Sequence, residues 1–174
     1  MILFRRTSPA VAALVAVLAG GCKPAGPTPL SEADRAAMRR TVEPALAMLT
    51  SPNPDWQKFV SIYAEDAVVM PGGTRPFVGH DSILVLLHNL PVFAEYKQTS
   101  DRLEGSGNLA YQIWTYIARI EEPKKPVVVD TGKDVFVWRK GADGSWKVAV
   151  EIWNSIMPQP EPAPAPATTP KRHT

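Results

Sequence analysis

Two acidic residues in the second half of the chain, Asp130 and Glu151, are the candidates for proton transfer. Both stand among branched and aromatic residues, and apolar surroundings raise the pKa of a carboxyl group toward the range in which it acts as a general base. The alternative is that Asp130 caps a turn and Glu151 faces solvent, which is the usual situation of acidic side chains. We take that alternative as the default, so the sequence names two catalytic candidates and assigns the role to neither.

A pocket for a small molecule needs aromatic side chains and a few polar groups in its wall. Our candidates for ligand binding are Trp114, Tyr116, Trp138 and Asn154. An aromatic residue on a strand is nevertheless more often ordinary core than a ligand contact.

Other chemistries have little support in the sequence. There are three histidines, and His173 stands in a proline-rich tail, so we predict no metal site and no cofactor. Gly72 and Gly73 do not form a phosphate-binding loop.

Cys22, the only cysteine, follows a short apolar segment at the N-terminus. Residues 1–6 carry two positive charges and residues 9–21 carry none, which is the layout of a signal peptide. The stretch from Leu18 to Cys22, LAGGC, resembles the lipobox of bacterial lipoproteins, although Ala19 stands where that pattern usually has Leu. The resemblance implies that Cys22 receives a diacylglycerol and a further acyl chain such as palmitate. The alternative is a secreted protein with a free thiol.

These features divide the chain into a signal peptide (1–21), a tether (22–30), one domain (31–158) and a proline-rich tail (159–174). Removal of Arg5 and Arg6 with the signal peptide changes 19 basic and 17 acidic residues to 17 of each, and a neutral chain gives no reason to expect nucleic-acid binding.

The partner we expect is a membrane, reached through the lipid. Lys23 in place of Asp implies, by resemblance, sorting to the outer membrane, facing the periplasm.

The first half of the domain has helical patterns. Ser31 and Asp34 are typical of a helix start, and we predict a helix over residues 31–43. Pro44 should break or kink it, with residues 45–49 continuing at an angle. A second helix follows Asp55, with an apolar face that includes Tyr63, and a third covers residues 81–89.

The second half has the alternation and the turn residues of strands. We predict strands over residues 95–103, 109–120, 127–139 and 145–156. In the last strand, Trp146, Val148, Val150 and Ile152 alternate with Lys147, Ala149, Glu151 and Trp153, so the first set should face the core. Helices followed by a strand meander predict an α+β domain.

Two sets of motifs resemble the SnoaL-like domain of the nuclear transport factor 2-like superfamily. The first set is Tyr63 to Gly73 (YAEDAVVMPGG) with Gly79 to Ile83 (GHDSI). The second set is DTGK at 130–133, VWRK at 137–140, DGSWK at 143–147 and IWNS at 152–155. This resemblance implies a cone in which a curved antiparallel sheet wraps around about three helices. It also implies an apolar pocket and a possible homodimer through the outer face of the sheet, on the side that carries Trp153.

The resemblance does not decide the function, since this fold supports many activities. Ketosteroid isomerase has a carboxylate base where this chain has Met70 and Pro71, and neither can move a proton. We therefore favour a membrane-anchored module that binds a small apolar ligand or assembles as a dimer. The alternative is an enzyme of the isomerase, cyclase or dehydratase type, in which Asp130 or Glu151 transfers the proton.

Overall fold

The computed structural model of the protein describes residues 28–157. The predicted signal peptide, the predicted lipid attachment site at Cys22 and the proline-rich tail lie outside the described residues. Within residues 28–157, no helix is both long and apolar enough to cross a membrane.

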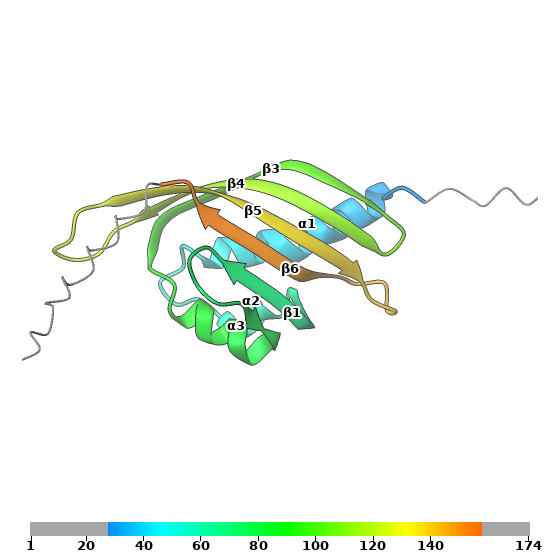
Figure 1. Cartoon of the computed structure of the whole chain (residues 1–174), viewed down its shortest axis with the longest axis horizontal. Helices are drawn as coiled ribbons and strands as arrows, with labels where there is room; N and C mark the ends of the chain where they lie inside the picture. The colour runs from blue at the N-terminus through cyan, green and yellow to red at the C-terminus, as the bar shows by residue number, and fades with distance from the viewer. Residues whose placement is uncertain (1–27, 158–174) are drawn as a thin grey trace, which may run out of the picture.

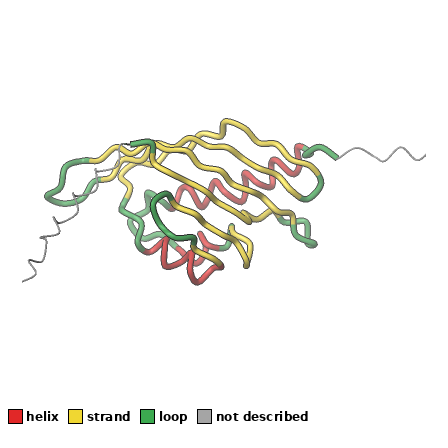
Figure 2. The backbone as a smooth tube through the Cα atoms, in the orientation of Figure 1, coloured by secondary structure: helices red, strands yellow, loops and turns green. Residues whose placement is uncertain are grey.

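The described residues form a curved six-stranded sheet that arches over three helices, which confirms the predicted α+β class (Figure 1). The elements are α1 (Glu32–Met48), α2 (Trp56–Val60), β1 (Tyr63–Pro71), β2 (Phe77–Val78), α3 (Gly79–His88), β3 (Phe93–Ser106), β4 (Leu109–Ile120), β5 (Val128–Lys140) and β6 (Trp146–Ser155). The strand order is β2-β1-β6-β5-β4-β3, and β1 runs parallel to β6 while the other pairs are antiparallel. Figure 2 shows the helices gathered on the inner side of the sheet.

Helix α1 begins where the sequence indicates. Ser31 and Asp34 form a capping box, in which each side chain accepts a hydrogen bond from the backbone of the other. The predicted break at Pro44 is wrong, because α1 continues to Met48. Pro44 faces solvent, while its neighbours Val42 and Ala45 are buried against the sheet, and we infer that this burial offsets the hydrogen bond that proline cannot make.

The second helix is shorter than predicted. Asp55 caps it as expected, through a hydrogen bond from the Lys58 amide, but it ends at Val60. Tyr63 is therefore the first residue of β1 and not part of a helical face. The parallel pairing of β1 with β6 sets Tyr63 opposite Val148 and directs its phenol under the sheet.

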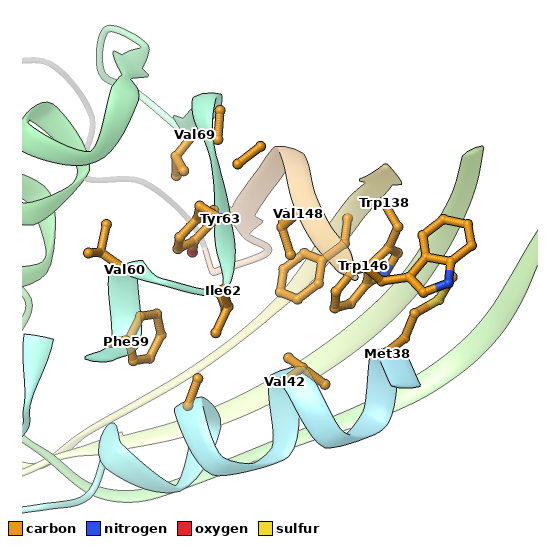
Figure 3. Packing of buried hydrophobic residues seen from close by; sticks show 14 of the residues in the cluster. Met38, Val42, Phe59, Val60, Ile62, Tyr63, Val69, Trp138, Trp146 and Val148 are labelled. Atoms are coloured by element: carbon orange, nitrogen blue, oxygen red, sulfur yellow. The ribbon is translucent and has the colours of Figure 1, made fainter. Parts of the chain in front are cut away.

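The core lies between α1 and the inner face of β4, β5 and β6. Figure 3 shows Met38 and Val42 of α1 beneath Trp138, Trp146 and Val148, all of which are at most 1% exposed. A carboxylate oxygen of Asp34 accepts hydrogen bonds from Trp146 Nε1 at 2.9 Å and from Lys140 Nζ at 2.7 Å. These bonds tie the start of α1 to the β5-β6 hairpin.

Strand β6 does not alternate along its whole length. Val148 pairs with Trp138 and Val150 pairs with Val137, so Ala149 has no residue opposite it and forms a β-bulge. Before the bulge, Trp146 and Val148 point inward as predicted. After it, the faces exchange: Glu151 is 8% exposed whereas Ile152 is 45% exposed.

The bulge corrects two expectations. Val150 and Ile152 belong to the outer face and not to the core, because they lie beyond the bulge. Trp153 is half-buried on the inner side and lines a cavity, so it is not the surface aromatic that would mark the outer face of the sheet.

Gly132 on β5 makes room for an aromatic ring on the inner face. It pairs with Tyr116 on β4, and a Cβ at this position would come within 2.2 Å of the Tyr116 ring. The absence of a side chain therefore lets Tyr116 lie across β5, where its hydroxyl reaches Asp130 at 3.0 Å.

Candidate functional site

A cavity of about 140 Å³ lies between the helices and the concave face of the sheet. The helices contribute apolar side chains to its wall, with Leu46 and Leu49 at the end of α1, Phe59 on α2, and Leu86 and Leu87 on α3. Pro91 and Phe93, which follow α3, extend this apolar wall.

The polar groups in the wall come from the strands. They are Tyr63 on β1, Tyr96 and Gln98 on β3, Tyr116 on β4, Asp130 and Asp134 on β5, and Glu151 on β6. The helices thus contribute an apolar surface, whereas the sheet contributes the polar groups together with apolar residues such as Val69, Ile120 and Phe136.

Glu151 is held inside the cavity wall by Tyr63. The Tyr63 hydroxyl donates to Glu151 Oε2, and both residues are buried. Burial raises the pKa of Glu151 to about 7, and the hydrogen bond from Tyr63 opposes that rise. Burial and the nearby Glu151 charge raise the pKa of the Tyr63 phenol, so Tyr63 remains a donor.

Asp134 is the second buried carboxyl group and is 3% exposed. Its Oδ2 accepts from Gln98 Nε2 at 2.8 Å, while Oδ1 and Gln98 Oε1 have no hydrogen-bond partner within residues 28–157. Burial, and then repulsion from Glu151, raise the pKa of Asp134 to about 9. Because the two carboxyl groups interact, they titrate as a pair, and between these two pKa values the pair retains one proton.

Asp130 lies in the same wall, nearer the start of β5 than Asp134. It accepts hydrogen bonds from Tyr116 at 3.0 Å and from Ser155 Oγ at 2.5 Å. Tyr96 stacks on Tyr116 with ring centroids 6.0 Å apart, which extends the aromatic surface beside this carboxylate. The strand position of Asp130 shows that it does not cap a turn.

No family model matches the sequence, and no curated protein sequence is significantly similar to it. Solved structures do match. A ketosteroid isomerase-like protein from Erwinia carotovora atroseptica superposes with a TM-score of 0.64 at 18% identity, over 74% of this chain and 100% of that one. A conserved protein from Planctomyces limnophilus gives a TM-score of 0.62 at 18% identity, over 72% and 98%.

An NTF2-like protein with a cystatin-like fold from Novosphingobium aromaticivorans gives a TM-score of 0.55 at 12% identity, over 71% of this chain and 82% of that one. The chain has the nuclear transport factor 2-like fold. At such low identities the likeness concerns the fold alone, so the function of this nuclear transport factor 2-like domain has to be argued from its own cavity.

The structure brings three of the residues singled out from the sequence into the cavity wall. These are Asp130, Glu151 and Tyr116. The default arrangement, with Glu151 in solvent, is wrong because the bulge at Ala149 turns this side chain inward.

The other three residues singled out for ligand binding lie elsewhere. Trp138 is fully buried in the core, where its Nε1 donates to Gln112 at 3.1 Å. Trp114 is buried and packs on Phe136. Asn154 is exposed on the outer side of β6, beside Gly72.

Four polar residues of the wall were missed in the sequence, namely Tyr63, Tyr96, Gln98 and Asp134. Asp134 alternates with Phe136 and Trp138, and this period of two is the signal that would have placed it on the inner face with the core aromatics. Tyr63 was assigned to a helical face, and only its parallel pairing to β6 reveals its contact with Glu151.

No metal site is formed in the part of the chain that the structure describes, since no group of three or more His, Cys, Asp or Glu side chains is arranged to hold an ion there. Met70 and Pro71, which occupy the isomerase base position by resemblance, lie on β1 beside Ile152 and Trp153. The carboxyl groups of this cavity thus come from β5 and β6.

Proposed function

We propose that this domain binds a small, largely apolar molecule whose single polar group meets the carboxyl groups of the cavity. The observation that carries the proposal is Asp134, a buried carboxyl group in the wall of the cavity with an oxygen that has no partner among the described residues. A buried polar atom without a hydrogen bond is costly, and a bound polar group would supply the missing bond.

The size of the cavity limits the ligand. Its volume of about 140 Å³ is close to the roughly 150 Å³ of an engineered apolar cavity that admits benzene. A single substituted ring is thus a reasonable size for a first probe, and toluene serves as an apolar reference.

Leu86→Trp tests binding at the cavity. Leu86 lines the cavity from α3, so the larger ring should occupy part of the space and weaken toluene binding by about tenfold or more, measured by NMR titration. Val85→Trp is the matched control, because Val85 is 56% exposed on the same helix and should leave binding unchanged. Equal toluene affinity in the two variants would contradict the proposal.

A second candidate function is proton transfer, which the pairing of Glu151 with Asp134 favours. A base with a pKa near 7 is ionised in part at neutral pH, and a neighbouring carboxyl that keeps its proton is a hydrogen-bond donor. With a small ketone in the cavity, Glu151 would remove an α proton while Asp134 donates to the developing enolate oxygen. Exchange of the Glu151 proton with solvent, followed by return of a solvent-derived proton to the α carbon, would complete the reaction.

Exchange of the α protons of cyclopentanone in deuterated water tests this chemistry by NMR. The rate should rise with pH through about 7 as Glu151 ionises, and Glu151→Gln should lower it by about a hundredfold. The exposed control Glu95→Gln should retain the rate. A rate that is unchanged by Glu151→Gln would exclude Glu151 as the base and leave ligand binding as the function.

We also propose that the chain is a lipoprotein of the cell envelope, attached through Cys22 to the outer membrane and facing the periplasm. The LAGGC segment before Lys23 supports this proposal. In a Gram-negative host, Cys22→Ser should abolish the incorporation of labelled palmitate, whereas wild-type protein should carry the label in the outer-membrane fraction. Labelled Cys22→Ser protein would refute the anchor.

A homodimer through the outer face of the sheet is the remaining part of the proposal. Ile113, Val135 and Ile152 form one apolar row across β4, β5 and β6, and Ile152 is 45% exposed. Ile152→Lys should shift the protein to monomer in sedimentation equilibrium, while Val85→Lys on α3 should not. A wild-type monomer at high concentration would exclude the dimer.

A further inference from the structure

Among the described residues, the wall of the cavity contains carboxyl groups but no basic side chain. Asp130, Asp134 and Glu151 line it, and within residues 28–157 no Lys, Arg or His side chain does. The other titratable groups facing this space are Tyr63, Tyr96 and Tyr116, while α1, α2 and α3 add only apolar residues. The described wall therefore contains no cation to compensate three carboxyl groups.

When Asp134 is ionised, the buried polar atoms of the wall that lack a partner are acceptors. The hydroxyls of Tyr63 and Tyr116 and the amide of Gln98 already donate to the three carboxyl groups. Asp134 Oδ1 and Gln98 Oε1 have no partner among the described residues, and Asp134 is nine-tenths or more buried. A ligand that satisfies both atoms must bring N–H or O–H donors.

Three aromatic rings line the same cavity as Asp134 and Gln98. Tyr96 stacks on Tyr116 with centroids 6.0 Å apart, and Phe93 lies tilted against Tyr96 at 5.5 Å, so the three rings form one aromatic cluster in the wall. Aromatic faces attract cations through their quadrupoles, most strongly where water is excluded.

We infer that the ligand of this cavity is a small apolar amine, bound as its ammonium cation, whose N–H groups donate to Asp134 Oδ1 and Gln98 Oε1. This inference rests on the proposed binding function and specifies the chemical class of the ligand. A neutral alcohol would satisfy one acceptor without balancing the carboxylates, and a carboxylate ligand would be repelled by them.

Proton release follows from cation binding. The carboxyl pair retains a proton near neutral pH because burial raises both pKa values and repulsion from Glu151 raises that of Asp134 further, and a bound ammonium group lowers both pKa values again. Binding should therefore release protons at a pH between the two values, and less at a higher pH where both groups are already ionised.

The experiment compares benzylammonium, benzyl alcohol and benzoate, which share one ring and differ in charge, by calorimetry at about pH 8. Benzylammonium should bind at least tenfold more tightly than benzyl alcohol, and benzoate should not bind. Repeating the titration in buffers of different ionisation enthalpy should reveal the released protons.

Asp134→Asn should reduce the preference for benzylammonium over benzyl alcohol by about tenfold or more, and Asp101→Asn, at an exposed position on β3, should not. If Asp134→Asn does not fold by circular dichroism, Glu151→Gln serves in its place. Benzyl alcohol binding as tightly as benzylammonium would overturn the inference and leave the binding function intact. Failure of both of these probes and of toluene to bind would overturn the binding function as well.

Discussion

Ala149, the residue of β6 without a partner on β5, determines how the rest of the site is built. Because side chains alternate with a period of two, one extra residue exchanges the faces of every position that follows. The start of β6 therefore belongs to the core, through Trp146 and Val148, whereas its end supplies Glu151 and Trp153 to the cavity. Without the bulge, Ile152 would point inward and Glu151 would face solvent.

Placing two carboxyl groups in an apolar interior has an energetic cost, and the neighbouring residues reduce it only in part. Tyr63 donates to Glu151 and Gln98 donates to Asp134, yet both pKa values remain raised. A fold selected for stability alone would replace such a pair with apolar residues of similar size. Its presence beside a cavity is the reason to assign it to binding or chemistry and not to the support of the fold.

Much of the fold could be predicted from the sequence because its signals are local. The cap at Ser31 and Asp34, the cap at Asp55 and the alternation of the long strands each depend on residues a few positions apart. The continuation of α1 through Pro44 could not be predicted in this way. It depends on the packing of Val42 and Ala45 against a sheet whose strands come much later in the chain.

The site was harder to predict from the sequence, because its geometry depends on contacts between segments that are far apart in the chain. A bulge depends on the pairing between two strands, and nothing in the alternation of residues 146–153 marks Ala149 as the residue left unpaired. Tyr116 was correctly placed in the wall, but the room for its ring comes from Gly132 on the next strand. Asp134 does have a local signal, because its spacing of two from Phe136 and of four from Trp138 places it on the same face of β5 as these core residues.

The separation of the wall into helical and strand contributions has a consequence for how such a domain could diversify. Leu46, Phe59 and Leu86 shape the space with apolar side chains, and the carboxyl groups stand on strands positioned by backbone pairing within the sheet. Substitutions on the helices can thus change which molecule fits while the same polar groups meet it. Part of the shape of the cavity is therefore encoded in the helices, separately from the strands that carry its polar groups.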